Sequence, residues 1–344
     1  MNELNHNNVF LKKAKNTSED KSIITRFEDN GPLSIFYPAL KTTNFSFKST
    51  KFFAIGSCFA KNLANHLRSR GCCVGPYYFN ENFIETLGDP LNWACGKTGK
   101  DKTPWNHVML GHFDPLHILQ DMQQVNAVLN KKSIEYPLWK LSEKDANYFA
   151  PGEIHYMSPF HTKIYAKDAE TIYSIVSSIY NSMKKSLVES DVFIITYGLA
   201  EYLAMKDSHL VAVNYGGTQR QSWRCTPSLM SPIDVQESML RLINLIKKIN
   251  PNAILFFSLS PVKLARTYLQ KYDIYSMGSL SKAILRCGIH NGIEEANLLF
   301  PNSVYYIPSY EYVTLGNYYA HDKRHVSSDA VKNIMNCFVE SYFD

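Results

Sequence analysis

The chain has 344 residues, of which 45% are hydrophobic and 13% aromatic, and its formal net charge is +5. This length favours one α/β domain with insertions, and the hydrophobic content can fill a sizeable core. The charge is modest and not concentrated in one run, which argues against a nucleic-acid-binding protein. No apolar run is long enough to span a bilayer, so a membrane-spanning protein is not expected either.

Residues 1–48 are predicted to be an N-terminal extension of the main domain. Residues 1–21 are polar and rich in asparagine, without the apolar stretch of a secretory signal, and we expect this start to be mobile. Apolar residues such as Phe36 and Phe45 indicate that the later part packs on the domain. The seven cysteines form no Cys-x-x-Cys pair and are typical of reduced thiols. Together these features predict a cytoplasmic protein.

The main domain begins with a predicted strand at residues 51–55, followed by Gly-Ser-Cys-Phe-Ala at residues 56–60. Apolar residues then recur at helical spacing up to Gly71, which predicts a helix over 58–70. Ser57 thus lies on a strand-to-helix turn, where its hydroxyl can project from the sheet and the helix N–H groups can bind an oxyanion. Serine is also a favoured N-cap, so this turn alone does not define a nucleophile.

The remaining elements alternate between strands and helices. A strand around residues 72–79 precedes a long irregular stretch, interpreted as an insertion at about 89–165. The pattern then predicts helix 167–188, strand 192–197, helix 232–248, strand 253–258, helix 279–298, strand 303–307 and a terminal helix that contains Val331 and Phe338. Such alternation indicates an α/β fold, a three-layer α/β/α sandwich with a mainly parallel central sheet. This main domain is expected over residues 49–344.

The loop before the terminal helix contains the partners that a nucleophilic serine needs. Asp322 and His325 are three residues apart. A histidine beside a serine hydroxyl can act as general base, and a carboxylate on the same turn can fix its tautomer. Ligands of parallel α/β sheets bind beyond the carboxyl ends of the strands, so we expect this loop to meet Ser57, Gly198 and Ser260 there. The same loop also fits a solvated, charged turn.

Taken together, the motifs resemble the GSCFA family of the SGNH (GDSL-like) hydrolase superfamily. Besides residues 56–60, the similarity covers Ser-Pro-Val at 260–262, Ser-Lys-x-x-Leu at 281–285, Pro-Ser-Tyr-Glu at 308–311 and Tyr-Ala-x-Asp-x-x-His at 319–325. These matches follow the family order and are weakest over residues 89–165. The resemblance implies an SGNH hydrolase-like fold with flavodoxin-like strand order and a catalytic triad of Ser57, His325 and Asp322.

The resemblance further implies a serine esterase-type hydrolase that cleaves an O-acyl ester on a carbohydrate or similar polar substrate. Ser57 would attack the ester carbonyl, His325 would carry the proton and Asp322 would orient His325. The expected partner is this small-molecule or carbohydrate ester, and no cofactor is expected. Two alternatives stay open: an O-acyltransferase to a saccharide with the same triad, and a catalytically lapsed carbohydrate-binding protein on the same scaffold.

The predicted oxyanion hole departs from the superfamily pattern. After the third strand, Ala200 stands where the superfamily has an asparagine, so a side-chain donor is missing there. The candidate donors are the backbone N–H groups of Ser57, Cys58 and Gly198 and the side chains of Asn80 and Asn214. Each asparagine also fits an ordinary turn position. Three further residues of the matching segments, Glu201, Ser260 and Tyr319, are expected to contact the substrate.

A cysteine nucleophile is one competing interpretation. The thiol of Cys58 would lie at a helix N-terminus, where a thiol pKa is lowered. However, one residue along a helix changes direction by about 100°, so Cys58 and Ser57 cannot both face the same histidine. The family resemblance also places the nucleophile at Ser57.

A zinc site is the other competing interpretation, because such a site needs three or four converging ligands. The sequence offers two sets, His321 with Asp322 and His325, and His107 with His112 and His117. Spacings of five residues do not bring side chains onto one helix face, which leaves the second set without geometric support. No metal site is therefore predicted.

Overall fold

The computed structural model describes residues 46–76, 112–134, 136–142, 155–161, 164–213 and 224–343, and the structural statements below concern these residues. Nearly all of the predicted extension over residues 1–48 lies outside them. Asn80, Asn214 and His107 also lie outside the described residues.

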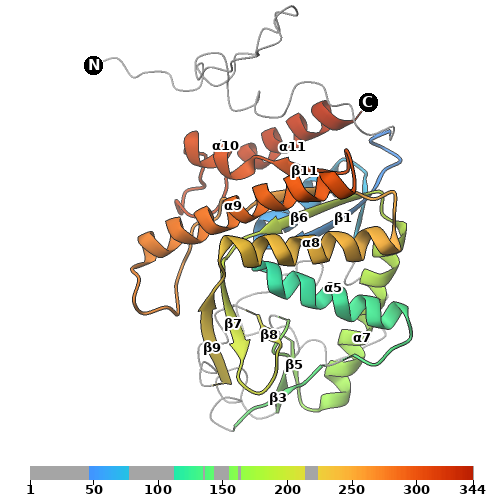
Figure 1. Ribbon diagram of the computed structural model, residues 1–344, viewed down its shortest axis with the longest axis vertical. Helices are drawn as coiled ribbons and strands as arrows, with labels where there is room; N and C mark the ends of the chain where they lie inside the picture. The colour runs from blue at the N-terminus through green and yellow to red at the C-terminus, as the bar shows by residue number, and fades with distance from the viewer. Residues whose placement is uncertain are drawn as a thin grey trace, which may run out of the picture.

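A five-stranded parallel sheet forms the centre of the molecule (Figure 1). Its strands are, in spatial order, β11 (Val304–Ile307), β10 (Ile254–Leu259), β6 (Val192–Tyr197), β1 (Lys51–Gly56) and β2 (Cys73–Gly75). Numbered along the chain, this is the order 2-1-3-4-5 of flavodoxin-like folds. The order reverses between β1 and β6, and ligands of open α/β sheets bind at such a switch point.

Three helices cover one face of the sheet. They are α2 (Cys58–Ser69), α10 (Ser309–Leu315) and α11 (Ser328–Tyr342). Phe52 of β1 and Phe256 of β10 belong to the core cluster on this side, together with Leu63 of α2 and Phe338 of α11. Ring centroids of Phe256 and Phe338 are 4.9 Å apart. In this layer α2, the helix that follows Ser57, packs against α11.

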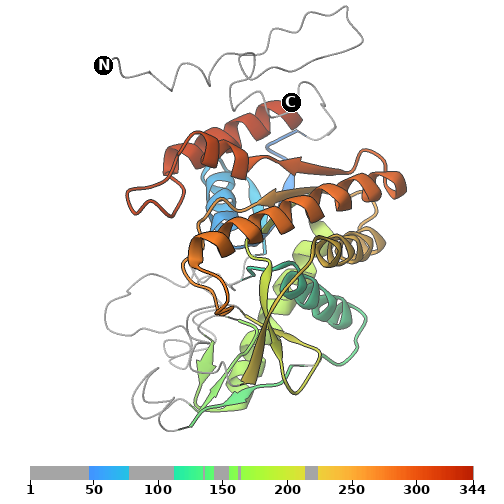
Figure 2. The same ribbon diagram turned by 60° about the vertical axis from the view of Figure 1, so that its left-hand side comes forward.

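The helices α7 (Ala169–Glu189), α8 (Pro232–Ile249) and α9 (Ile274–Leu299) lie on the opposite face (Figures 1 and 2). The neighbours of the residues above, Phe53 and Phe257, point to this side because successive strand side chains alternate between faces. Phe53 stacks on Phe193 with centroids 5.0 Å apart. The predicted three-layer α/β/α sandwich is thus confirmed.

Part of the stretch at about 89–165 is regular, so the prediction of an irregular insertion was wrong there. Helix α5 (Pro115–Leu129) begins after the N-cap Asp114, whose Oδ1 accepts a hydrogen bond from the His117 N–H at 2.8 Å. Its buried face includes polar residues such as His117, Gln120 and Asp121. This face lacks the apolar periodicity by which amphipathic helices are recognised.

Two small antiparallel sheets lie at the end of the molecule away from α11 (Figures 1 and 2). One consists of β3 (Trp139–Lys140), β4 (Tyr156–Met157) and β5 (Tyr165–Ala166), and the other of β8 (Val211–Ala212), β7 (Glu201–Met205) and β9 (Cys225–Leu229). The first also lies in the expected insertion. The second sheet begins with β7, directly after the loop that follows β6.

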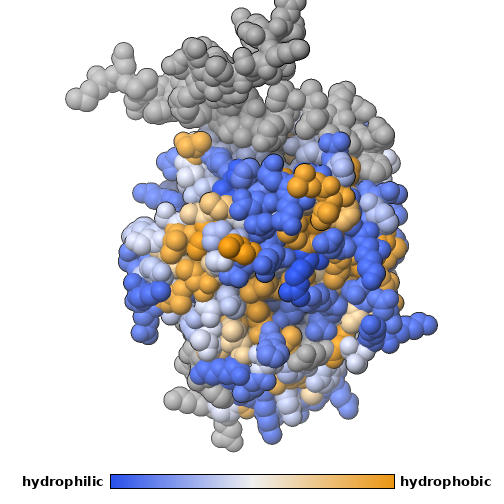
Figure 3. All heavy atoms as spheres, viewed as in Figure 1, coloured by the Kyte–Doolittle hydropathy of each residue, from blue (hydrophilic) through white to orange (hydrophobic). Residues whose placement is uncertain are grey.

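Hydrophilic and hydrophobic residues are interspersed over the face drawn in Figure 3. Exposed large hydrophobic side chains include Tyr275 and Leu298 of α9. Within the described ranges, no helix combines the length and the apolar character needed to cross a membrane.

Candidate active site

Ser57 lies at the carboxyl end of β1, on the turn into α2. It is the N-cap of α2, and its Oγ accepts a hydrogen bond from the Phe59 N–H at 3.4 Å. The preceding Gly56 has φ +144°, and a Cβ at this position would lie 2.4 Å from the Thr196 carbonyl oxygen. Only glycine permits this conformation and this close approach of β1 to β6. The strand–turn–helix context predicted for Ser57 is therefore present.

The Ser57 hydroxyl lies between the loops that follow β6 and β10. Its Oγ donates to Oγ of Ser260 at 3.3 Å. A Cβ built on Gly198 would lie 3.7 Å from the same Oγ. The structure thus brings together Ser57, Gly198 and Ser260, as expected for residues at the carboxyl ends of parallel strands.

Asp322 and His325 form a tight, hydrogen-bonded turn. Oδ2 of Asp322 lies 2.5 Å from Nδ1 of His325, and Oδ1 accepts from the backbone N–H groups of Arg324 at 3.0 Å and His325 at 2.9 Å. These hydrogen bonds, above all that of the imidazole, hold the pKa of Asp322 well below its usual range. An ionised carboxylate at Nδ1 keeps the proton there and leaves Nε2 as the acceptor.

The turn packs on the segment after β10. The Lys263 N–H donates to the Arg324 carbonyl oxygen at 3.4 Å, and Nε of Arg324 donates to the Lys263 carbonyl oxygen at 3.1 Å. Ser57 bonds to the same segment through Ser260. Among the hydrogen bonds of the described residues there is none between Ser57 and His325, so the two parts of the expected triad border one segment without a hydrogen bond between them.

Cys58 has the environment of an inert thiol. Burial raises its pKa, and the nearby charges of Arg324 and Lys282 oppose this rise only in part. The thiolate is the reactive form of cysteine, so a raised pKa lowers its reactivity at neutral pH.

Lys282 is a site residue for which sequence analysis had no role beyond its place in a motif. Its buried ammonium group donates to the carbonyl oxygens of Gly198 at 2.8 Å and Ser260 at 2.6 Å. Burial lowers its pKa to about 7. The neighbouring Ser281 accepts from the Ala200 N–H at 2.8 Å. The Ser-Lys pair of α9 therefore ties together the loops after β6 and β10.

The Gly198 N–H, an expected oxyanion donor, has another acceptor in this structure. Both Gly198 and Leu199 donate their N–H groups to the carbonyl oxygen of Phe113, each at 2.8 Å. Cys58 is the first residue of α2, and the first N–H groups of a helix have no intrahelical acceptor. The expected donors Asn80 and Asn214 lie outside the described residues.

Glu201 and Tyr319 were both expected to contact the substrate, but their positions in the structure differ. Glu201 is buried, and its carboxylate accepts hydrogen bonds from the Thr267 hydroxyl and from the Tyr268 N–H. This arrangement gives Glu201 a structural position inside the protein. Tyr319 lies at the site, where its hydroxyl donates to the Pro261 carbonyl oxygen at 3.4 Å.

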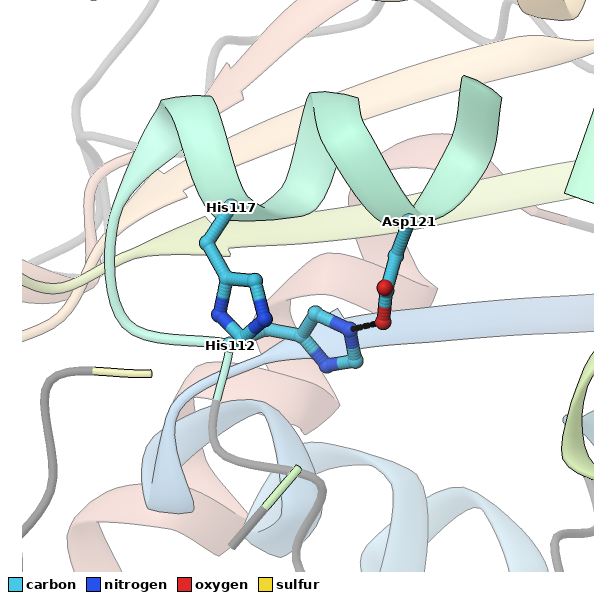
Figure 4. A group of neighbouring side chains, drawn as sticks. All are labelled: His112, His117 and Asp121. Carbon is cyan, nitrogen blue, oxygen red and sulfur yellow. Dashed lines mark hydrogen bonds and ion pairs between the residues drawn. The ribbon is translucent and has the colours of Figure 1, made fainter. Parts of the chain in front are cut away.

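A buried cluster of histidines and an aspartate lies at the start of α5, and Figure 4 shows three of its members, His112, His117 and Asp121. Nε2 of His112 lies 2.6 Å from Oδ2 of Asp121, and Nε2 of His161 lies 3.0 Å from the same oxygen. The rings of His112 and His117 stack with centroids 5.0 Å apart. The argument that their spacing keeps these histidines apart was wrong, because His112 precedes the helix and His117 lies within it.

In this cluster the pKa of Asp121 and the pKa of His117 are both lowered, for different reasons. Burial raises the pKa of Asp121, but the adjacent His161 and His112 outweigh this effect and hold it well below the usual value. Burial lowers the pKa of His117 to about 3, and Asp121 opposes this shift only in part. The His117 ring is therefore neutral. The four-residue spacing of His117 and Asp121 was the signal in the sequence, because it places both on one helix face.

A separate pocket is lined by aromatic side chains, among them Tyr136, Trp139 and Tyr173. Its lining contains no residue from the carboxyl ends of β1, β6 or β10. It is therefore distinct from the site around Ser57.

The fold and site define a doubly wound α/β protein with an N-cap serine at the switch point and an Asp–His turn that packs on the segment after β10. The model of the GSCFA family matches residues 51–338, and the chain belongs to this family. The match extends from β1 into α11 and includes Ser57, Lys282 and His325. No curated protein matches the chain.

Proposed function

We propose that this protein is a serine esterase-type hydrolase that cleaves O-acyl esters. The observation that carries the proposal is the Asp322–His325 turn, in which a carboxylate binds Nδ1 of the imidazole. This turn packs on the segment after β10, to which the N-cap serine of α2 also bonds through Ser260. A solvated charged turn would not need the carboxylate to bond both the imidazole and the backbone of the same residue. Family membership agrees with this proposal and supplies no substrate.

In the proposed reaction, Oγ of Ser57 attacks the ester carbonyl while Nε2 of His325 takes its proton. The tetrahedral intermediate collapses, the alcohol leaves with that proton, and the acyl group stays on Ser57. Water then attacks the acyl-enzyme with His325 as base, and the carboxylic acid is released. Ser57 must exchange its bond with Ser260 for one with His325, and such catalytic bonds are often long before substrate binds.

The oxyanion would be stabilised at the N-terminus of α2. The N–H of Cys58, the first residue of α2, has no intrahelical acceptor and would donate to the oxyanion, and the positive end of the helix would add to its effect. Gly198 could donate only after its N–H leaves the Phe113 carbonyl oxygen. Below about pH 7, where Lys282 is protonated, its buried ammonium group adds positive potential close by.

We propose a carbohydrate or similar polar alcohol as the part of the substrate that leaves. The rim formed by the Asp322–His325 turn is exposed and polar, and Tyr319 adds an aromatic ring next to it. Lys263 lies on that ring, with Nζ 4.0 Å from its centroid. A polar rim with an aromatic ring of this kind suits a sugar better than an apolar alcohol.

Labelling with a fluorophosphonate probe tests the nucleophile. We expect the wild-type protein to be labelled and Ser57→Ala to remain unlabelled. Ser69→Ala, at the exposed end of the same helix, is the matched control and should label like the wild type. A wild-type protein that never reacts, or a Ser57→Ala variant that still does, would overturn the proposal.

Release of acetate from p-nitrophenyl acetate tests the fate of the acyl group. His325→Ala should lower turnover by about 100-fold or more, since a general base contributes on the order of 10²–10⁴-fold. The assay is repeated with a saccharide added. Accumulation of acylated saccharide in place of acetate would show an acyltransferase and not a hydrolase.

A further inference from the structure

The cluster at the start of α5 has the geometry of a metal site. Among the described residues, His112, His117 and Asp121 form the one group of potential ligands that converge, with their ligand atoms all within 4.8 Å of one another. A Zn²⁺ ion binds nitrogen and oxygen at about 2.0–2.2 Å, so two of its ligands are at most about 4.4 Å apart. Small side-chain movements therefore suffice to place all three around one ion.

His117 provides an independent indication of a ligand. Both of its ring nitrogens are buried, and within the described part of the chain neither has a hydrogen-bond partner. An unsatisfied buried polar group costs about 1–3 kcal/mol. The ion pair of His112 with Asp121 explains those two side chains but leaves His117 unexplained. A metal ion at one of these nitrogens would satisfy its lone pair.

The surroundings resemble the outer shell of a metal site. The hydroxyl of Tyr180 donates to Oδ1 of Asp121 at 3.0 Å, and His161 contacts Oδ2. Nδ1 of His161 lies 2.6 Å from the Tyr136 hydroxyl. Carboxylate ligands in proteins are oriented by such hydrogen bonds.

We propose that His112, His117 and Asp121 bind a divalent transition-metal ion, with Zn²⁺ as the first ion to test. Two histidines and a carboxylate are typical ligands of this class of ion. The burial of all three side chains favours a structural role. The ion would fix the loop of Phe113, whose carbonyl oxygen holds the Gly198 and Leu199 N–H groups beside Ser57.

Metal content and Zn²⁺ binding test the proposal without reference to activity. We expect the full-length wild-type protein, purified without chelator, to contain one transition-metal ion per chain by elemental analysis. Removal with EDTA should lower Tm, and Zn²⁺ alone should restore it. Wild-type protein that contains no such ion and whose Tm does not respond to Zn²⁺ would overturn the proposal.

A set of matched variants locates the ion. His117→Leu should bind Zn²⁺ at least about 100-fold more weakly, because loss of a direct ligand exceeds the effect of its supporting residues. The same substitution at the exposed His290 of α9 should leave binding unchanged. His325→Ala should also retain the ion, which separates the cluster from binding at the surface turn.

The stability of His117→Leu is a second test of whether a metal ion is bound. Without a metal, replacement of an unpartnered buried imidazole by an apolar side chain costs little or stabilises the protein. With a metal, the variant loses the stabilisation by Zn²⁺. A His117→Leu protein as stable as the wild type, with the same metal content, would refute the site. If this variant does not fold, Co²⁺ substituted into the wild type decides, since a tetrahedral site gives Co²⁺ strong visible absorption. A hydrated, octahedral ion at the surface absorbs only weakly, and such a weak spectrum would refute the site.

Discussion

Gly56 controls how closely the Ser57 turn approaches β6. Its φ of +144° lies outside the range that other residues favour, and an added Cβ would meet the Thr196 carbonyl oxygen at 2.4 Å and the Thr196 Cβ at 2.9 Å. Backbone atoms of a central strand cannot move away cheaply. The glycine therefore fixes the position from which Ser57 extends.

Gly56→Ala should lower the free energy of unfolding by several kcal/mol, because strain and a backbone clash add together. Gly71 offers a matched control, since it also has positive φ, at +86°, but an added Cβ there meets nothing within 4 Å. Gly71→Ala should cost only about 1 kcal/mol. Urea unfolding of both variants measures the difference, and equal losses would contradict the role of the close approach.

Lys282 should make stability depend on pH. Its pKa falls from 10.5 to about 7 on folding because the ammonium group is buried. Below about pH 7 both states hold the proton, and the cost of burying the charge is present in full. Between about pH 7 and 10.5 only the unfolded chain holds it, so stability rises with pH by about 1.4 kcal/mol per unit. Lys282→Met should remove this rise, and parallel pH curves for the two proteins would contradict it.

At the scale of single residues, the sequence predicted what local spacing determines. The N-cap position of Ser57 was predicted because a strand pattern changes to a helix pattern at that point. The turn of Asp322 and His325 was predicted because the two residues are three apart. The contacts of Lys282 and Glu201 depend on residues far away along the chain. Their partners are set by tertiary packing, which no local pattern encodes.

At the scale of elements, the predicted helices and strands outside the insertion are present with small shifts of their bounds. The largest shift is at α9, predicted from residue 279 but beginning at Ile274 after the N-cap Asp273. Helix α5 was missed, although Asp114 and Pro115 are typical start signals. Its buried His117 and Asp121 break the apolar pattern, and a buried polar cluster cannot be distinguished from an exposed one in the sequence.

Glu201 links β7 to the segment after β10. A substitution of Glu201 distinguishes a structural role from a role in substrate contact. Its carboxylate, at the start of β7, holds Thr267 and Tyr268 of the segment after β10. Glu201→Gln should lower the free energy of unfolding by about 1–3 kcal/mol, since it weakens charge-assisted hydrogen bonds. Glu237→Gln, exposed on α8, is the control. Unchanged stability with a raised KM would instead support substrate contact.

At the scale of the molecule, alternating strand and helix patterns were enough to predict a parallel sheet between two helix layers. Continuous apolar runs such as residues 192–197 mark strands that are buried on both faces. The small sheets were not predicted, because strands such as β3 and β4 have two residues each and show no alternation. Their pairing depends on the surrounding helices α5 and α7.

This difference between the sheets should appear in hydrogen exchange. β6 is buried along its length and paired on both sides, with β1 and with β10, so its amides can exchange only when the whole domain unfolds. The two-residue strands of the β3–β4–β5 sheet have few ladder bonds and should open locally. Exchange followed by mass spectrometry should therefore protect β6 most. In Gly56→Ala, exchange from β6 should accelerate in proportion to the loss of global stability, while exchange from β4 stays unchanged; equal acceleration of both would indicate a single cooperative unit.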